Sequence, residues 1–137
     1  ISTPEGSISL PLSPDIADRP RQIVDAEHGK PATTLFRVID RCDGITRIEF
    51  RPLTGRTHQL RVHAAHRQGL NAPIVGDQLY GTQLTPDERL NMPAQSLGLQ
   101  PQRLGQHPQR LCLHARNLQF VHPVTHQPLS FTSPTPF

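Results

Sequence analysis

Prolines are spread along the whole chain, and they restrict it to short elements of secondary structure. There are 15 prolines among 137 residues, and five of them fall within residues 1–31. Because proline cannot donate a backbone hydrogen bond and clashes with a preceding helical turn, this first part cannot form a long helix. The sequence therefore predicts an extended, turn-rich beginning, with the alternating residues Ile8, Leu10 and Leu12 in a short strand.

Two runs rich in β-forming residues follow this beginning. They cover residues 35–39 and 45–50, and an Asp43-Gly44 pair lies between them. Because an Asp-Gly pair supplies the positive φ angles of a tight turn, the pattern predicts an antiparallel hairpin. Three shorter β-rich runs near the end of the chain predict further strands, at residues 111–113, 118–121 and 129–131.

Two short helices are expected between these strands. The first covers about 57–69, where Thr57 can cap the start and Gly69 the end. The second opens at residues 85–88, Thr-Pro-Asp-Glu, a capping box with proline at the first helical position. Residues 91–110 are rich in Gln, Pro and Gly and predict a flexible loop. The sum is an α+β domain with a mostly antiparallel, mixed sheet and one or two short helices.

Positive charge is concentrated in one segment of the chain. From Phe50 through Gly76 there are four arginines, three histidines and no Asp or Glu. The net charge of the whole chain is only +3, so the local cluster is more informative than the total. A cluster of positively charged side chains next to glycines is typical of a site that binds an anion, and a polyanion such as RNA is the natural candidate.

Metal binding and a membrane location are both disfavoured. His63 and His66 are one helical turn apart with His58 nearby, but no carboxylate or thiolate lies within the segment, and its arginines would repel a dication. Cys42 and Cys112 do not form a C-x-x-C motif, which favours a reduced, cytoplasmic setting. No apolar run approaches the ~18 residues of a membrane-spanning helix.

Several other catalytic patterns are missing or ambiguous. Neither G-x-S-x-G nor G-x-x-x-x-G-K-[ST] occurs, which disfavours a serine hydrolase and a P-loop. Residues 55–57, Gly-Arg-Thr, could bind a phosphate at the start of a helix or could serve only as a turn, and both interpretations stay open. Asp77 follows a glycine and is expected to bond backbone amides in a turn. Tyr80, among apolar neighbours, is expected in the core.

Arg61 is the strongest candidate for a functional side chain. It is expected in the middle of a helix beside the small residues Ala64 and Ala65, which leave room for another group to approach. An arginine in such a place usually pairs with a carboxylate or a phosphate. No carboxylate of this chain is an obvious partner, so the partner is predicted to come from elsewhere.

The segment from Pro52 to Gly81 closely resembles the RluA-type RNA pseudouridine synthases. Their signature has the form P-L-x-G-R-x-H-Q-[IL]-R-x-H, followed by P-I-x-G-D-x-x-Y-G and then by L-H-A, and this chain contains all three pieces. The last piece is residues 113–115. The resemblance spans nearly the whole chain and departs from the family in the Gln- and Pro-rich segment between Gly81 and Leu111.

The resemblance implies isomerisation of uridine to pseudouridine in ribosomal or transfer RNA, in the cytoplasm and without a cofactor. In the family, the nucleophile is an Asp in an upstream H-R-L-D-x-x-T-S-G motif, and residues 1–137 contain no such motif. The chain is therefore expected to be the C-terminal portion of a catalytic domain, inactive alone, with the missing N-terminal half as its partner. Because a divided sheet has open edges, self-association is an expected alternative.

The family's functional residues map onto a few positions here. Arg61 corresponds to the arginine that forms an ion pair with the nucleophilic Asp and lowers its pKa. Leu113 is a weaker candidate, for packing against the base-stacking ring of the family. Residues expected to contact RNA are Arg51, Arg56, His58, Gln59 and Lys30, and no metal ligands are expected. A rival interpretation is a non-catalytic RNA-binding module, which salt-dependent RNA affinity of the chain would favour.

Overall fold

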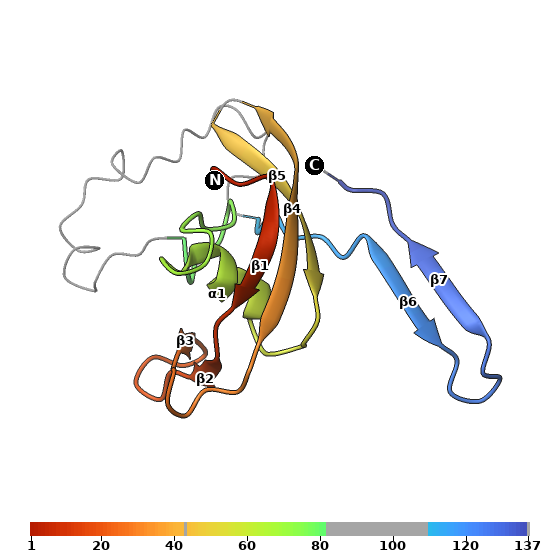
Figure 1. Ribbon diagram of the computed structural model, residues 1–137, viewed down its shortest axis with the longest axis horizontal. Coiled ribbons are helices and arrows are strands. Elements are labelled where there is room, and N and C mark those ends of the chain that lie inside the picture. Colours follow the sequence, from red (N-terminus) through yellow and green to blue (C-terminus); the bar gives the residue numbers. More distant parts are fainter. Residues whose placement is uncertain (43, 82–109, 137) are drawn as a thin grey trace.

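The computed structural model describes residues 1–42, 44–81 and 110–136, and within them the chain forms three small antiparallel sheets and one short helix, α1 (Gln59–Ala65) (Figure 1). In chain order the strands are β1 (Glu5–Ser9), β2 (Leu12–Pro14), β3 (Gln22–Val24), β4 (Thr33–Cys42), β5 (Ile45–Pro52), β6 (Asn117–Val121) and β7 (Pro128–Thr132). This arrangement confirms the predicted α+β class with antiparallel sheets and a short helix. The second predicted helix, at 85–88, and most of the predicted loop at 91–110 lie outside the described residues.

The largest sheet has the strand order β1-β4-β5 and contains the predicted hairpin. In that hairpin, β4 and β5 pair antiparallel from Thr34 opposite Pro52 to Cys42 opposite Ile45, so the paired region is longer than the sequence predicted. The register shifts between Val38 and Asp40, which places a bulge in β4. Gly44 has a φ of 79°, the left-handed conformation that the Asp-Gly turn requires.

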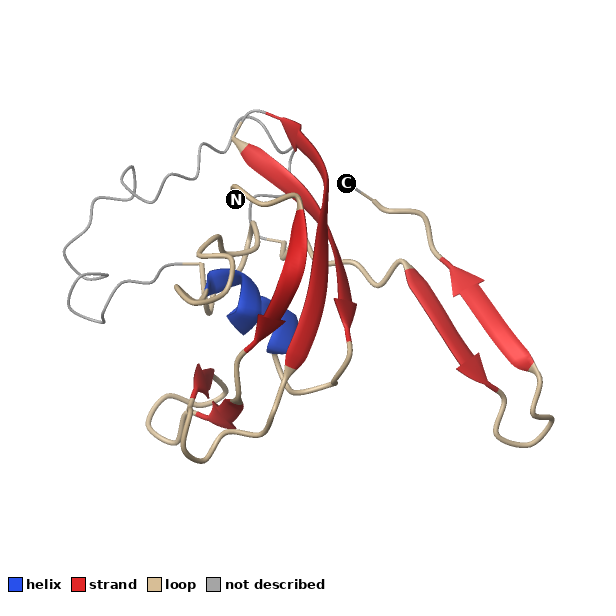
Figure 2. Cartoon of the chain, in the orientation of Figure 1, coloured by secondary structure: helices blue, strands red, loops and turns tan. Residues whose placement is uncertain are grey.

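The helix lies against one side of this sheet, and the core forms between them and the small β2-β3 ribbon (Figure 2). The main cluster of buried apolar residues is small: Leu12, Ala32, Val62, Ala65 and Tyr80, with Val24 and Leu79 packed against it. Two polar side chains, Thr34 and His63, are fully buried beside it. The hydrogen bonds of Thr34 with Gln59 and His63 fix α1 against β4, and with it the side chains that project from the helix.

The helix is shorter than the predicted range of 57–69. His58 has a φ of 54° and makes no side-chain capping bond, so the helix begins at Gln59 and Thr57 does not cap it. At the other end His66 is already extended, and Gly69 lies beyond the helix in the following turn. A Cβ at Gly69 would collide with the carbonyl oxygen of His63, so this glycine is required for close packing rather than as the first residue after the helix.

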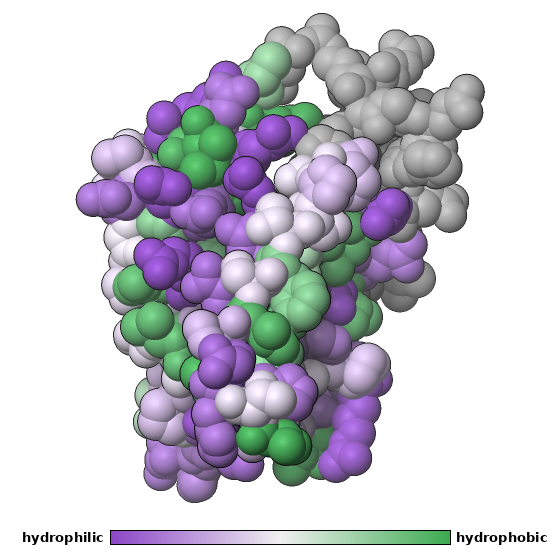
Figure 3. Space-filling view, turned by 90° about the vertical axis from the view of Figure 1, so that its right-hand side faces the viewer, coloured by the Kyte–Doolittle hydropathy of each residue, from purple (hydrophilic) through white to green (hydrophobic). Residues whose placement is uncertain are grey.

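Strands β6 and β7 form a separate hairpin that projects from the rest of the molecule (Figure 1). They confirm the strands predicted at 118–121 and 129–131, whereas residues 111–113 are not a strand. Leu118 lies opposite Phe131, and Phe120 lies opposite Leu129, so these four side chains share one face of the hairpin. Figure 3, which views the molecule from this side, shows hydrophobic side chains interspersed with hydrophilic ones over the surface.

No helix among the described residues is long and apolar enough to cross a membrane.

Candidate functional site

Arg61 projects from the middle of α1, and its guanidinium is paired with a carboxylate from the loop after the helix. Its Nε donates to Oδ2 of Asp77 at 2.8 Å, and its Nη2 donates to Oδ1 at 2.7 Å. The Asp77 side chain is completely buried, whereas the Arg61 side chain keeps 17% of its exposure. A two-point pair of this kind is stronger and more directional than a single-contact ion pair.

The prediction that this chain offers Arg61 no carboxylate is therefore wrong. The loop after α1 folds back and brings Asp77, 16 residues farther along the chain, against the helix. A signal for this pairing is present in the sequence, because Asp77 is the first acidic residue after the acid-free segment that contains Arg61. The predicted turn role of Asp77 was correct but incomplete.

Asp77 forms that turn with its carboxylate and its backbone. Its Oδ1 accepts the backbone N–H groups of Leu79 and Tyr80, both at 2.9 Å, and its carbonyl accepts the N–H of Gly81 at 2.8 Å. Burial alone would raise the pKa of the Asp77 carboxyl, but the hydrogen bonds from Arg61 and from the two amides outweigh it and lower the pKa. The same pair raises the pKa of Arg61, so both groups are charged at neutral pH.

Tyr80 is buried in the core, as predicted, and its hydroxyl joins two other elements. The hydroxyl oxygen accepts the backbone N–H of Gln22 at 2.8 Å and lies 2.9 Å from Nδ1 of His58. The direction of this second bond depends on the tautomer of His58: the hydroxyl donates to Nδ1 when the ring proton is on Nε2, and it accepts from Nδ1 when the proton is there. Burial, followed by the charge of Arg61, lowers the pKa of His58 and favours the neutral ring.

Two guanidinium groups lie over the ring of Tyr80. The Cζ atom of Arg61 is 5.1 Å from the ring centroid, and that of Arg21 is 5.2 Å from it. Both distances are within the range in which the ring face attracts a cation. The site therefore contains two arginines and one buried carboxylate, so its net charge is positive.

Part of the Arg61 guanidinium is left for another ligand. A guanidinium carries five N–H donors. Asp77 takes the one on Nε and one on Nη2, and within the described residues the two N–H groups of Nη1 and the second on Nη2 have no protein acceptor. This remaining edge has the fork geometry that binds a carboxylate or a phosphate at two points.

Three of the residues predicted to contact RNA are exposed cations. Arg51, Arg56 and Lys30 all have exposed side chains. The Nε of Arg56 donates to the carbonyl of Pro31 at 3.1 Å, so Arg56 is fixed beside the backbone that follows Lys30. His58 is half-buried and lies between these cations and α1 along the chain.

Gln59, also predicted to contact RNA, is inside the protein. Its side-chain oxygen accepts from the hydroxyl of Thr54 at 2.8 Å and from the backbone N–H of Arg56 at 3.0 Å. Its side-chain nitrogen donates to the carbonyl of Thr33 at 3.0 Å and to the hydroxyl of Thr34 at 2.9 Å. With 4% exposure and both polar atoms fully used, Gln59 has no group to offer RNA, so this prediction is corrected to a structural role.

Leu113 is half-buried and follows a residue that is tied to the loop of Asp77. The backbone N–H of Cys112 donates to the carbonyl of Val75 at 2.8 Å. The start of the L-H-A segment is thus held beside Val75, which is two residues before Asp77 in the chain. The predicted packing of Leu113 against a base-stacking ring stays a prediction.

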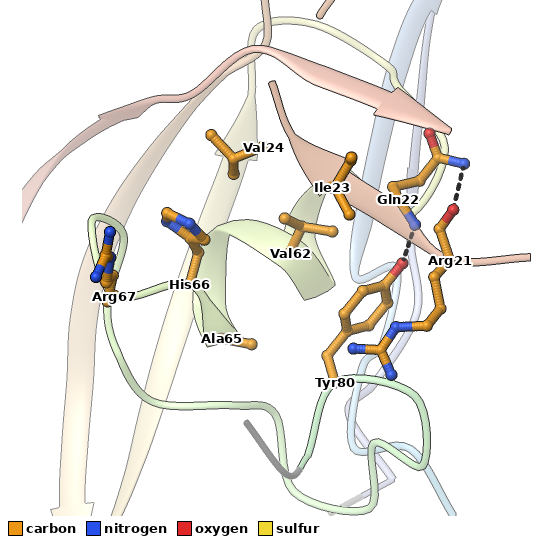
Figure 4. A pocket seen from close by; sticks show the side chains of 9 residues that line it. All are labelled: Arg21, Gln22, Ile23, Val24, Val62, Ala65, His66, Arg67 and Tyr80. Carbon is orange, nitrogen blue, oxygen red and sulfur yellow. Dashed lines mark hydrogen bonds between the residues drawn. The ribbon is translucent and has the colours of Figure 1, made fainter. Parts of the chain in front are cut away.

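A cavity of about 370 Å³ opens beside the Arg61 helix face (Figure 4). Its lining is Arg21, Gln22, Ile23, Val24, Val62, Ala65, His66, Arg67 and Tyr80. Figure 4 shows Arg21 and Tyr80 on one side and Arg67 and His66 on the other, with Val24, Ile23 and Val62 between them. The cavity therefore combines an apolar floor with cationic walls and has no acidic residue in its lining.

The histidines that could have suggested a metal site have other partners. His63 is fully buried, with Nδ1 at 3.0 Å from the hydroxyl of Thr34 and Nε2 at 3.3 Å from the carbonyl of Leu10. In the part of the chain that the structure describes, no three His, Cys, Asp or Glu side chains are grouped as a metal ion would need. Cys42 and Cys112 are not joined in a disulfide.

Comparison with known proteins gives a consistent result. The family model of RNA pseudouridylate synthase matches residues 1–66. The chain is 41% identical to the dual-specificity RNA pseudouridine synthase RluA of Pasteurella multocida, over 97% of this chain and 51% of that protein. It is 42% identical to the enzyme of the same name from Escherichia coli, over 67% of this chain and 40% of that protein. The chain thus spans about half the length of its curated relatives, or less.

A solved structure shares the fold. The chain resembles human RNA pseudouridylate synthase domain containing 4 with a TM-score of 0.61 and 22% identity, over 97% of this chain and 52% of the human one. At this identity the likeness concerns the fold alone. The 41% identity to the Pasteurella multocida enzyme covers almost the whole of this chain, and it shows that this chain belongs to the RluA-type family of RNA pseudouridine synthases.

Proposed function

We propose that this chain forms part of an RNA pseudouridine synthase, which isomerises uridine to pseudouridine in ribosomal or transfer RNA. The observation that carries the proposal is the guanidinium of Arg61, fixed at two points by buried Asp77 with a second donor edge still available. The unused N–H donors of Arg61 would bind an anionic group, such as a carboxylate or a phosphate. The exposed cations Lys30, Arg51 and Arg56 suit an RNA backbone.

In the proposed reaction the nucleophile is an Asp carboxylate from the part of the domain that lies outside this chain. It attacks C1′ of the flipped-out nucleotide as the bond from C1′ to N1 of the uracil breaks. The uracil rotates, its C5 forms the new bond to C1′ as the Asp carboxylate leaves, and the proton lost from C5 is matched by one taken up at N1. The free edge of Arg61 forms an ion pair with that carboxylate, which keeps it ionised and directed at the nucleotide. The isomerisation needs no cofactor, and two unpaired cysteines fit the cytoplasmic location that we propose.

Other residues of this chain would bind and shape the substrate. Lys30, Arg51 and Arg56 neutralise phosphates, and His58 offers Nε2, the ring nitrogen that does not contact Tyr80, to a polar group of the RNA. Leu113 packs against the base-stacking ring of the completed pocket. The missing N-terminal half of the catalytic domain is the expected protein partner, and self-association of the chain is the alternative when that half is not present.

The test is pseudouridine formation in ribosomal and transfer RNA transcripts, measured by mass spectrometry with the full-length protein that contains this chain. Wild type should form pseudouridine, and this chain alone should form none. Arg61→Ala should lower kcat by about 10²- to 10³-fold, because it removes a fixed charge from the reacting group. Arg61→Ala activity at the wild-type rate would overturn the assigned role.

A non-catalytic RNA-binding module is the second candidate, because residues 1–137 contain no H-R-L-D motif. The two functions differ in what the full-length protein does. Salt-dependent RNA binding together with no pseudouridine formation in any transcript would favour the binding module. Formation of pseudouridine at a defined uridine would exclude it.

A further inference from the structure

We propose that Asp77 is a positioning residue for Arg61: it fixes the plane and rotation of the guanidinium so that the free edge faces the reacting carboxylate. This inference rests on the proposed function and deepens it. Neither the relatives nor the motif assigns such a role to this Asp. The starting observation is the two-point contact, with Nε and Nη2 of Arg61 at 2.8 and 2.7 Å from the two carboxylate oxygens.

The contact leaves the guanidinium little freedom to turn. A single hydrogen bond lets an arginine rotate about that bond, whereas two parallel bonds to one carboxylate make the two planes align. Once Nε and Nη2 of Arg61 are fixed, Nη1 must point away from Asp77 because the guanidinium is flat and rigid. The direction of the free edge is therefore set by Asp77.

Asp77 is itself fixed by its surroundings. Its side chain has no exposure, and its Oδ1 accepts the backbone N–H groups of Leu79 and Tyr80. Those amides belong to the turn that buries Tyr80 in the core. The core therefore fixes the turn, the turn fixes the carboxylate of Asp77, and this carboxylate fixes the guanidinium of Arg61 on α1.

No other described contact can replace this one. The ring of Tyr80 lies under the guanidinium of Arg61 at 5.1 Å, and it offers a flat face that does not select a rotation within the plane. Arg21, whose Cζ lies 5.2 Å from the centroid of the same ring, is a cation and has no atom that could accept a hydrogen bond from Arg61. Without the charge of Asp77, a largely buried cation would be left unpaired and would turn toward solvent.

The decisive variant is Asp77→Asn in the full-length protein. Asn keeps the shape and keeps an oxygen for the Leu79 and Tyr80 amides, so the turn is preserved. It replaces the other oxygen, which accepts from Nε of Arg61, with an NH2 group that cannot accept that bond. We expect kcat for pseudouridine formation to fall roughly 10- to 100-fold with KM for RNA nearly unchanged, because orientation and not substrate binding is lost.

A matched control makes the same chemical change elsewhere. Glu49→Gln removes the charge from the exposed ion pair of Arg37 and Glu49, which are 2.9 Å apart on the β4-β5 hairpin. This variant should keep wild-type kcat and KM. Unfolding in urea measures any loss of stability separately, and kcat is compared where each variant is fully folded.

A double-mutant cycle separates positioning from a general structural role. If Asp77 acts through Arg61, then Asp77→Asn should change kcat much less when Arg61 is already alanine. Wild-type kcat in Asp77→Asn, or an undiminished effect in the Arg61→Ala background, would overturn the inference while leaving the proposed function intact. If wild type itself forms no pseudouridine, the proposed function fails instead.

Discussion

His63 shows how a residue that resembles a ligand in the sequence can be a structural member of the core. It is completely buried, and its two nitrogens contact the hydroxyl of Thr34 and the carbonyl of Leu10. Nε2 donates to the carbonyl, and in the neutral ring Nδ1 then accepts from the hydroxyl of Thr34. Burial is the main cause that lowers the pKa of His63, and the nearby His66 lowers it further.

This neutral histidine predicts a stability that depends on pH. In the unfolded chain a histidine titrates near pH 6.5, so its contribution is fully present above that pH and is lost as the pH falls toward the lower pKa of the folded state. His58 and His66 have pKa values lowered in the same direction. Urea unfolding should therefore give a lower free energy of unfolding at about pH 5.5 than at about pH 7.5, by at most about 1.4 kcal/mol per histidine.

The variant His63→Gln should reduce that pH difference even though it lowers stability at both pH values. His28→Gln, at a side chain with 77% exposure, is the control and should leave most of the difference in place. An unchanged pH dependence in His63→Gln would show that His63 is not one of the titrating groups.

The residue scale is also where prediction from sequence was least complete. Arg61 and Tyr80 were placed correctly in a helix and in the core, because their neighbours along the chain set those environments. The partners of Arg61 and Gln59 were not, because they depend on contacts between segments distant in sequence. Asp77 reaches Arg61 across a loop, and Gln59 reaches Thr33 and Thr34 on β4, 26 and 25 residues earlier.

At the scale of elements, local turn chemistry and alternation were sufficient for the hairpins. The Asp-Gly turn predicted β4 and β5, and the β-rich runs predicted β6 and β7. The start of α1 was harder to predict, because it depends on His58 adopting a left-handed conformation while its ring contacts Tyr80. Residues 111–113 were predicted as a strand. The backbone N–H of Cys112 donates to the carbonyl of Val75 in the neighbouring loop, but this single hydrogen bond does not make a strand ladder.

The β6-β7 hairpin has one face that is unusually apolar for a surface. Leu118, Phe120 and Phe131 are 58, 42 and 55% exposed, and the rings of Phe120 and Phe131 stack at 6.0 Å. Because these side chains lie on the same face as Leu129, they form one continuous surface. We expect this chain to self-associate through that face when no other part of the domain covers it.

The double variant Leu118→Lys with Phe131→Lys should weaken this self-association by at least about tenfold, since each burial of a large apolar side chain is worth about 1.5–3 kcal/mol. Sedimentation velocity at several concentrations measures it. Gln119→Lys with Ser130→Lys adds the same two charges on the opposite face and should have little effect. A wild-type chain that sediments as a single monomer at all concentrations would contradict the expectation.

At the scale of the whole molecule, charge is distributed so that the total says little about function. The net charge of +3 is small, yet the segment from Phe50 to Gly76 contains four arginines and no acid. The fold places Arg56 beside the backbone after Lys30, which adds a cation from a distant part of the sequence. RNA affinity should therefore depend on where charges lie rather than on their sum.

A pair of substitutions that leaves the net charge unchanged tests this directly. Arg56→Glu removes a cation from the proposed RNA surface, and Glu5→Lys on the exposed strand β1 restores the total of +3. If local placement decides binding, the double variant should bind RNA about tenfold or more weakly, with a log–log salt slope about one unit shallower than wild type. Glu5→Lys alone should leave the slope nearly unchanged. Recovery of wild-type affinity in the double variant, measured by fluorescence anisotropy from low to high salt, would instead mean that total charge controls binding and that Arg56 does not contact the RNA.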